Sequence, residues 1–362
     1  MHVCHISTEH SAYEDRIYHK ECWSILDWAD KITVIARGGS APDVTYPGIE
    51  VLSYPSGLKL RDRLSYLRDL AVDLQADIYH LHNPELLLLS HFLRKRTEAA
   101  LLYDMHAPHP EFMRTFSDDA TFTQNVRSFL LGIGERTALT AVDGLIFPSF
   151  SLYENMRHSA RFSTILYNFP RLDYFPQTNS RDPRDFTIIY KGPVSEPHGL
   201  LYLIQAFYYF YRREQHGRLH IVGDILPPEF EHTLRNTIKY FSLSHAVTLE
   251  SAGENGEIAD AMRAASVGVS ALLPRAFFRK AVPSNIFEYM AMGIPVVAGH
   301  FPSAYQFIHA PKSGVVLEES TPYSIADALS FLYNHQQERT LMGERGKALV
   351  QKEWRWDHMK ST

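Results

Sequence analysis

The chain has only two cysteines, Cys4 and Cys22, among its 362 residues. Two thiols are too few for a disulfide framework or a cysteine-based zinc site. Their place near the start of an α/β pattern predicts buried thiols in a reducing, cytoplasmic compartment. No apolar run reaches the length of about 18 residues that a membrane-spanning helix needs. The first ten residues also lack the apolar segment of a signal peptide.

An excess of positive charge is absent as well. The 36 Lys and Arg residues are outnumbered by 41 Asp and Glu residues, and the net charge is −5, which argues against nucleic acid as a partner. The chain has no Asp-x-Asp pair. We therefore expect no metal site, and nothing in the composition calls for a cofactor.

What is present is the composition of a soluble globular protein, with 45% hydrophobic and 21% charged residues. The length suits two cores. Strands and helices alternate in both halves, which predicts α/β domains with parallel sheets. Expected strands are 3–7, 32–36, 78–81, 100–104, 144–147, 186–190, 219–222, 247–249, 267–270, 296–298 and 315–317. Expected helices include 15–28, 62–75, 86–94, 122–140, 200–213, 230–241, 257–265 and 324–334. The predicted divisions are an N-terminal domain over 1–170, a linker over 171–185, a C-terminal domain over 186–345 and a final helix over 346–362.

The most informative segment is PSNIFEYMAMGIPVVAG, residues 283–299. Its first half predicts a helix that Ser284 or Asn285 caps, and Gly293 ends it. Glu288 would then lie in the first turn, where free N–H groups attract an anion and a carboxylate can accept bonds from sugar hydroxyls. Local chemistry leaves a second interpretation open, in which Asn285 and Glu288 only form a capping box.

A family resemblance follows from this segment. Residues 288–298 resemble the signature E-[AY]-M-A-x-G-x-P-V-[VI]-A of glycosyltransferase family 4, and residues 283–290 resemble a branch that reads P-x-K-x-x-E-[YF]-M, with Asn285 in place of its lysine. Another glutamate of many members falls on Lys280. The order of the other landmarks matches over nearly the whole chain.

The resemblance implies the GT-B fold: an α/β protein of two facing Rossmann-like domains, each a mostly parallel sheet with flanking helices. It also implies a nucleotide-diphosphate sugar donor held by the C-terminal domain, with Glu288 on the ribose and Ser284 and Asn285 beside it. No metal or cofactor is implied, and transfer would retain the anomeric configuration.

A glycine turn opens the second half. Gly192 and the pair His198-Gly199 resemble the family's Y-x-G-x6-G turn, whose backbone N–H groups can approach a phosphate. Gly223 resembles its I-V-G-x-G turn with the second glycine missing. The alternative is a structural αβ turn without a ligand.

Cations that neutralise the leaving diphosphate in many relatives are replaced here by Pro193 and His198. A histidine can help when it is protonated or as a neutral hydrogen-bond donor. Lys191 and Lys280 could substitute if their side chains point inward.

His106 ends a predicted strand in the segment Y-D-M-H, which resembles a family segment whose histidine faces the transferred sugar. Strand ends line the ligand crevice in open α/β sheets, so His106 is the catalytic candidate. The alternative is a capping or surface histidine.

Two further strand-end signals lie on the predicted acceptor side. His80 and His82 share a face in an extended chain, a spacing compatible with a metal, but the sequence shows no convincing partner set for them. His82 belongs to the segment D-I-Y-H-x-H that resembles the family's acceptor side. Arg16 either reaches a phosphate or pairs with Glu14 or Asp15.

The expected function is therefore a metal-independent, retaining glycosyltransferase. The resemblance implies a glycan or lipid-linked acceptor, in bacterial surface polysaccharide assembly. The basic stretches 58–68 and 94–96 either touch the inner face of a membrane or are solvated helix faces. Two rival functions remain: a non-catalytic binding or scaffold subunit, and a nucleotide-sugar epimerase on the same fold.

Overall fold

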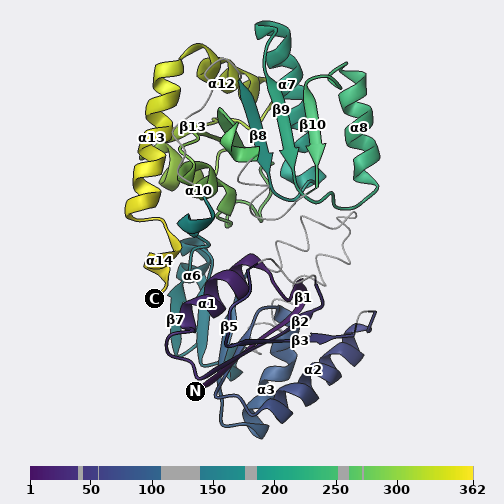
Figure 1. The fold of residues 1–362 in the computed structure, drawn as a ribbon, viewed down its shortest axis with the longest axis vertical. Coiled ribbons are helices and arrows are strands. Elements are labelled where there is room, and N and C mark those ends of the chain that lie inside the picture. Colours follow the sequence, from purple (N-terminus) through teal and green to yellow (C-terminus); the bar gives the residue numbers. More distant parts are fainter. Residues whose placement is uncertain are drawn as a thin grey trace. The chain divides into compact units, whose positions relative to one another are not determined.

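The computed structural model describes residues 1–39, 44–55, 57–106, 139–175, 186–251, 261–270 and 273–361. It divides into two compact units (Figure 1). Unit 1 comprises Met1–Asn168 with Met359–Thr362, and unit 2 comprises Phe169–His358. Most of the helix expected over 122–140 and the first four residues of that over 257–265 lie outside the described residues, as does most of the predicted linker.

Unit 1 contains a seven-stranded sheet in the order β3-β2-β1-β4-β5-β6-β7, in which every pair is parallel. The strands are β1 (His2–Ser11), β2 (Lys31–Arg37), β3 (Ile49–Tyr54), β4 (Ile78–Leu81), β5 (Ala100–Asp104), β6 (Gly144–Phe147) and β7 (Phe162–Ile165). The sequence did not predict β3 and β7. Both are edge strands that are largely only half-buried, so they lack the continuous apolar run that marks a central parallel strand.

Along the chain, the helices of unit 1 alternate with these strands (Figure 1). They are η1 (Asp15–Cys22), α1 (Trp23–Ile25), α2 (Leu60–Leu74), η2 (Pro84–Leu86), α3 (Leu87–Arg96), η3 (Leu139–Ala141) and α6 (Phe150–Met156). Within the expected helix over 15–28, the first part is a π-helix. In a π-helix residues five apart are hydrogen-bonded, so side chains five apart lie on one face. The Lys20 ammonium accordingly lies 2.6 Å from the Asp15 carboxylate.

Unit 2 contains a six-stranded, fully parallel sheet in the order β10-β9-β8-β11-β12-β13. The strands are β8 (Thr187–Lys191), β9 (Arg218–Val222), β10 (Val247–Glu250), β11 (Val267–Ser270), β12 (Val296–Ala298) and β13 (Gly314–Val316). Two parallel sheets with flanking helices confirm the predicted fold class of two Rossmann-like domains.

The helices of unit 2 follow the predicted order. They are η4 (Leu172–Tyr174), η5 (Glu196–His198), α7 (Leu200–Glu214), α8 (Phe230–Tyr240), α10 (Ser284–Ala291), α11 (Pro302–Ala304), η6 (Tyr305–His309), α12 (Pro322–Asn334), α13 (Gln336–Lys352) and α14 (Trp356–Met359). The segment 346–362, predicted as one helix, instead holds the end of α13 and the separate short α14.

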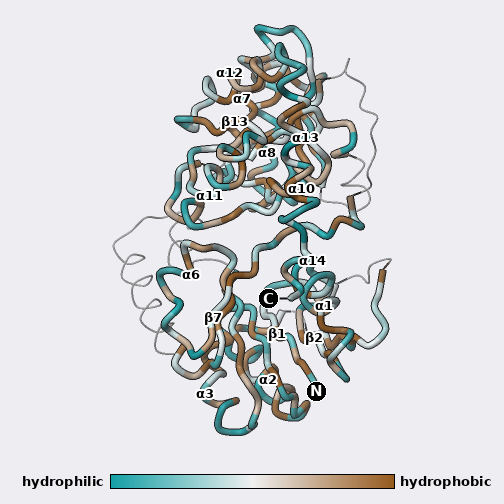
Figure 2. Tube along the Cα trace, turned by 90° about the vertical axis from the view of Figure 1, so that its left-hand side faces the viewer, coloured by the Kyte–Doolittle hydropathy of each residue, from teal (hydrophilic) through white to brown (hydrophobic). Residues whose placement is uncertain are grey.

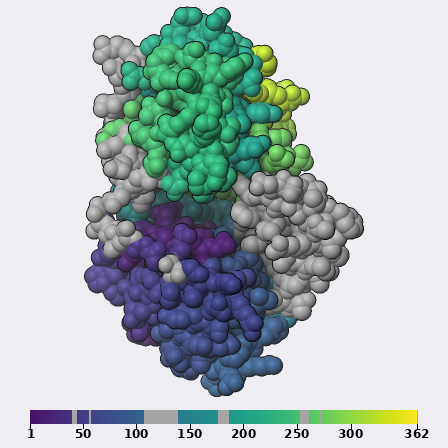
Figure 3. Space-filling view, turned by 90° about the vertical axis from the view of Figure 1, so that its right-hand side faces the viewer, coloured from purple at the N-terminus to yellow at the C-terminus, as the bar shows by residue number. Residues whose placement is uncertain are grey.

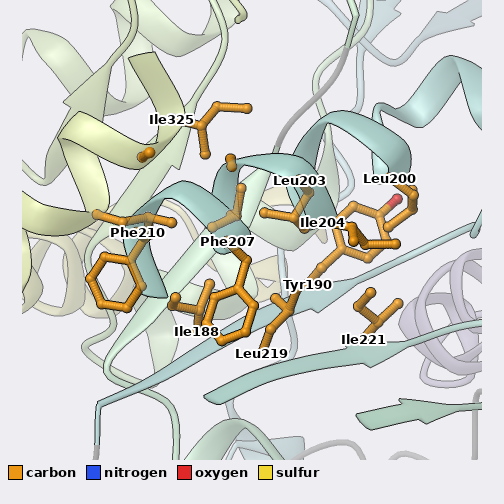
Figure 4. Packing of buried hydrophobic residues seen from close by; sticks show 14 of the residues in the cluster. Ile188, Tyr190, Leu200, Leu203, Ile204, Phe207, Phe210, Leu219, Ile221 and Ile325 are labelled. Carbon is orange, nitrogen blue, oxygen red and sulfur yellow. The ribbon is translucent and has the colours of Figure 1, made fainter. Parts of the chain in front are cut away.

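The core of unit 2 shows why α7 lies on the sheet. Its buried side chains recur at helical spacing and point toward β8 and β9 (Figure 4). The labelled members are Leu200, Leu203, Ile204, Phe207 and Phe210 on α7, with Ile188, Tyr190, Leu219 and Ile221 on the strands. Each such side chain contributes about 1.5–3 kcal/mol on burial. Along the trace in Figure 2, hydrophobic stretches coincide with the strands and inner helix faces.

Each sheet has one place where the strand order reverses. In unit 1 it lies between β1 and β4, and in unit 2 between β8 and β11. Open parallel sheets bind ligands outside the carboxyl ends of the strands at such switch points. The two candidate regions are therefore the residues that follow β1, β4 and β5, and those that follow β8 and β11.

Gly268 on β11 connects this packing to the unit 2 switch point. A Cβ atom added there would lie 2.4 Å from ring atoms of Tyr289, which is fully buried on α10. The Tyr289 hydroxyl in turn accepts a 2.7 Å hydrogen bond from the Lys191 N–H at the end of β8. Glycine thus allows the tyrosine to reach the strand end.

We expect Gly268→Ala to destabilise unit 2 by about 1–3 kcal/mol, the usual cost of overpacking a core. Gly38→Ala is the matched control, because its added Cβ would meet nothing closer than 3.7 Å. Chemical unfolding of both variants measures the difference. Equal stability of the two would show that Tyr289 moves aside at no cost.

Candidate functional site

The unit 2 switch point holds a partly buried ion pair. Lys191 is the last residue of β8, and its Nζ lies 2.6 Å from Glu288 Oε2 on α10. The Lys191 side chain is 25% exposed, so the pair lies at the edge of the core, where a ligand can reach the ammonium group. Lys191 therefore points inward, as the sequence analysis required of a substitute cation.

The capping-box interpretation of Asn285 and Glu288 is wrong. Asn285 Nδ2 donates to the Lys191 carbonyl at 2.8 Å, and Glu288 pairs with the Lys191 side chain. The helix N-cap is Pro283, and no side chain caps it. Both polar side chains thus face the end of β8 instead of their own helix terminus.

The predicted helix start also needs correction. Because α10 begins at Ser284, Ser284 is not the cap, and Glu288 lies beyond the first turn. Its carboxylate is positioned by the side-chain pair with Lys191 and not by the terminal N–H groups. Pro283 holds φ −65° and ψ 124°, an extended conformation suited to the entry of the helix.

The three glycines that the sequence analysis singled out occur at their positions for different structural reasons. Gly223 must be glycine, because a Cβ there would lie 1.8 Å from the Gly192 carbonyl oxygen. Gly199 has φ +79° and forms the N-cap of α7 in the left-handed region, where glycine carries no steric penalty. Gly192 has φ +146°, and an added Cβ would come within 3.8 Å of Asn285 Nδ2. Gly192 and Gly223 therefore lie beside the Lys191–Glu288 pair.

His198 does not supply a positive charge. Burial lowers its pKa to about 4, so the ring is neutral at physiological pH. Its Nδ1 lies 2.6 Å from Ser195 Oγ, and its ring packs against Phe278. Lys280 lies in the turn before α10, where its N–H donates to the Phe277 carbonyl.

Two buried acceptor atoms near the pair have no hydrogen-bond partner in the described part of the chain. They are Asn285 Oδ1 and Ser270 Oγ, the latter on the last residue of β11. Sequence reasoning missed Ser270, although its place at the end of a buried strand was a usable signal. Unsatisfied buried polar atoms are costly, so they mark places where a ligand can complete the hydrogen bonding.

In unit 1, Arg16 is buried, and its ion-pair partners are Asp104 and Glu21 instead of the predicted Glu14 or Asp15. It makes a bidentate contact with Asp104, Nε to Oδ2 at 3.0 Å and Nη2 to Oδ1 at 2.9 Å. Its Nη1 donates to the Leu166 carbonyl, and Nε lies 2.9 Å from Glu21 Oε1. Glu21 is five residues from Arg16, so the π-helix brings both to one face.

His106 follows β5 and rests on two buried groups. Its Nε2 lies 3.0 Å from His82 Nδ1 and 3.3 Å from Asp104 Oδ2, while 19% of its side chain is exposed. It is therefore neither an isolated surface residue nor a cap. His82 is buried beneath it, so this predicted acceptor-side residue supports His106 from within the sheet edge.

The partner set that the sequence did not reveal for His80 and His82 is present. His5 on β1 and Glu21 on η1 join them, and one ligand atom from each of the four lies within 4.8 Å of the others. A second group of the same kind contains His82, Asp104 and His106. His5 lies inside a predicted strand, but its neighbours become known only from the order of the strands.

Burial controls the protonation of this region. It lowers the pKa of His5, His80 and His82 well below the usual value, with neighbouring imidazoles adding to the effect. Burial and the charge of Asp104 raise the pKa of Glu21 well above its usual value. For Asp104, burial is outweighed by Arg16 and His106, which hold its pKa well below the usual range. Three neutral imidazoles thus surround one carboxyl group.

Residues 107–138, which follow His106 in the chain, lie outside the described residues. Cys4 and Cys22 are both buried free thiols, as expected. No helix in the described part of the chain has both the length and the apolar character to cross a membrane.

Residues 185–335 match the profile of the family Glycosyl transferases group 1. The likeness to the group 1 glycosyl transferases is carried by this segment, which is less than half of the chain. The match covers β8, the glycine turn and α10, the elements that form the unit 2 switch point. The family resemblance seen in the sequence is therefore confirmed for this domain.

Individual proteins also resemble this chain in sequence or in structure. The chain is 33% identical over 70 residues to a GDP-mannose-dependent alpha-(1-6)-phosphatidylinositol monomannoside mannosyltransferase of Mycobacterium tuberculosis, a match that covers 19% of this chain and 18% of the relative. Sucrose-phosphate synthase from Thermosynechococcus elongatus has a similar structure, with TM-score 0.81 at 15% identity over 99% of this chain and 96% of that one. Anabaena HepE in complex with UDP-glucose has TM-score 0.74 at 15% identity over 100% of this chain and 97% of that one. At such identities the structural likeness establishes the fold.

Proposed function

We propose that the protein is a glycosyltransferase that moves a sugar from a nucleotide-diphosphate sugar to an acceptor hydroxyl, with retention of configuration. The observation that carries the proposal is the Lys191–Glu288 pair at the unit 2 switch point, inside the group 1 domain. Two unsatisfied acceptors among the described residues, Asn285 Oδ1 and Ser270 Oγ, lie at the same strand ends. This set offers a cation for a diphosphate and oxygen acceptors for sugar hydroxyls.

In this proposal Glu288 accepts hydrogen bonds from the donor ribose, and Lys191 neutralises the diphosphate. The N–H groups of Gly192 and Gly199 do not take part, because they donate to the Val222 and Glu196 carbonyls; Lys191 is the cation of this proposal. The diphosphate then needs no divalent cation of its own, so the transfer step is metal-independent. Relatives with UDP-glucose and GDP-mannose in their names support a nucleotide-sugar donor.

His106 is the proposed catalytic residue. In this proposal its exposed edge is the part available to the transferred sugar, while Asp104 and His82 hold the ring from behind. As the bond from the anomeric carbon to the diphosphate breaks, positive charge develops on the sugar, and a neutral imidazole can stabilise it. The acceptor oxygen then bonds to that carbon on the same face, and its proton leaves with the diphosphate.

The proposed acceptor is a glycan or a lipid-linked saccharide at the cytoplasmic face of a bacterial membrane. The mycobacterial relative carries a phosphatidylinositol mannoside in its name. Helices α2 and α3, drawn indigo to blue in Figure 3, include the exposed apolar residues Leu60, Tyr66 and Leu88. Lys59 and Arg61, at the start of α2, are exposed basic residues. Such a mixture suits contact with anionic lipid.

A second candidate function is a non-catalytic nucleotide-sugar-binding subunit. The neutral state of His198 favours it, because one cation of the family pattern is then missing. An epimerase on the same fold is the third candidate. Release of nucleoside diphosphate from UDP- and GDP-sugars, with and without lipid-linked acceptors, separates the three.

Release that depends on the acceptor would support transfer. Release with isomerisation of the free sugar would support the epimerase. Stabilisation by nucleotides without turnover would support the binding subunit, because a ligand raises the melting temperature by mass action alone.

We expect Glu288→Gln to weaken donor binding about 10–100-fold, the usual worth of a hydrogen bond to a charged group. The fold should lose little, because the amide retains the shape of the side chain. Isothermal titration with the nucleotide sugar measures the affinity, and thermal unfolding measures the stability.

The matched control is Glu231→Gln, which breaks an exposed pair with Arg235 in the same unit. It should leave donor affinity unchanged. If Glu288→Gln lowers stability while donor affinity stays intact, the Lys191–Glu288 pair is structural only.

We expect His106→Ala to lower kcat about 10²–10⁴-fold while nucleotide affinity changes little, as for a group that acts in the transition state. His91→Ala on the exposed side of α3 serves as the control. A folded His106→Ala protein with near-normal turnover would remove His106 from the catalytic machinery.

A further inference from the structure

Three histidines and one glutamate converge at the unit 1 switch point, and the transfer chemistry proposed above uses only one of them indirectly. Glu21 Oε2 lies 3.9 Å from His5 Nδ1, 3.9 Å from His80 Nε2 and 3.8 Å from His82 Nε2. His5 Nδ1 and His82 Nε2 are 3.0 Å apart. The four side chains, called the histidine–glutamate cluster below, are all more than 90% buried.

The parallel sheet explains the convergence. His5 of β1 and His80 of β4 are register partners, so their side chains are neighbours on one face of the sheet. His82 lies two residues beyond His80 and returns to that face. The π-helix then places Glu21 against the three rings, with Arg16 on the far side of its carboxylate.

The histidine–glutamate cluster leaves several buried polar atoms unsatisfied. Within the described part of the chain, Glu21 Oε2, His80 Nε2 and His5 Nε2 have no partner in hydrogen-bonding geometry, whereas Glu21 Oε1 lies 2.9 Å from Arg16 Nε. His80 Nε2 is one of the atoms that face Glu21. At 3.8–3.9 Å the rings are too far from the carboxylate to donate to it. Buried unsatisfied groups of this kind are costly unless something lies between them.

We propose that His5 Nδ1, His80 Nε2, His82 Nε2 and Glu21 Oε2 together bind one Zn²⁺ ion. Three imidazoles and one carboxylate are a zinc ligand set. A tetrahedral site with bonds of about 2.0–2.1 Å has ligand atoms about 3.3–3.4 Å apart. Four of the six separations are 3.0–3.9 Å and bracket that value, and one ligand atom from each residue lies within 4.8 Å of the others.

The surroundings supply the outer contacts that metal sites require. Arg16 Nε lies 2.9 Å from Glu21 Oε1, the oxygen that does not face the rings. His82 Nδ1, the nitrogen away from the ion, lies 3.0 Å from His106 Nε2 and 3.6 Å from Asp104 Oδ2. Such contacts fix the orientation of ligating side chains. Because burial keeps the imidazoles neutral, their lone pairs are available to a metal.

Four protein ligands leave no open position, so the ion is structural and takes no part in the transfer chemistry. It ties β1, β4 and η1 together and holds His82, which in turn contacts His106. Zinc binding can therefore be tested without reference to the proposed function, although His82 connects the site to His106. The zinc site is also distinct from a cation at the donor diphosphate, which belongs to unit 2.

The test starts with untagged protein expressed with added zinc and freed of loose metal by gel filtration. Elemental analysis should find about one zinc per chain. Protein stripped by a strong chelator in mild denaturant should melt at a lower temperature and recover with Zn²⁺. Substitution with Co²⁺ should produce the visible absorption of a tetrahedral cobalt site.

Glu21→Gln distinguishes the zinc site from a metal-free hydrogen-bond network. In a network without metal, the amide keeps the shape of the side chain and should cost little. In a zinc site the same change removes an anionic ligand. The variant should then lose zinc and lower the melting temperature.

His80→Ala should lose zinc as well, whereas the control His2→Gln should not. His2 lies on the same sheet, but its Nε2 contacts Thr33 Oγ1 outside the histidine–glutamate cluster. A wild-type protein that contains no zinc and is neither stabilised by Zn²⁺ nor coloured by Co²⁺ would overturn the proposal. So would a Glu21→Gln protein that retains full zinc content.

Discussion

All strands in each sheet run in the same direction, and this constraint determines where polar groups can meet. A parallel sheet is buried on both faces, so its strands are mostly apolar and polar residues gather where each strand ends. All those ends lie at one edge. In unit 1 that edge collects His82, Asp104 and His106; in unit 2 it collects Lys191 and Ser270. Polar and charged side chains are concentrated at this edge because the rest of each sheet is buried and mostly apolar.

The ion pairs at the two edges differ in how accessible their charges are. At the unit 1 edge, Arg16 and Asp104 are both buried and satisfy each other, so their charges are not available to a mobile ligand. At the unit 2 edge, the Lys191 ammonium group remains partly exposed, and its pair with Glu288 can exchange partners with a bound molecule. A buried pair of the first kind is costly to break, whereas one of the second kind can reorganise.

Local patterns predicted the central strands well, because β4, β5 and β6 are short apolar runs bounded by polar residues. They also predicted the helix that holds Glu288 and the importance of His106, whose role stays a prediction. They failed where a contact joins distant segments. Arg16 and Asp104 are 88 residues apart, and only the strand order brings His5 beside His80. The sequence predicted a regular helix over 15–28 and not the π-helix. The contact between Arg16 and Glu21, which are five residues apart, was therefore not foreseen.

The division of the chain has a consequence for how the protein is made. Unit 1 contains Met1–Asn168 and also Met359–Thr362, with Lys360 paired to Asp27 and lying over the Trp23 ring at 4.7 Å. A ribosome releases the chain from its N-terminus, so unit 1 acquires this piece only after all of unit 2 has been synthesised. Folding of the first unit thus begins early and finishes last, and cutting the chain between the units would leave it incomplete.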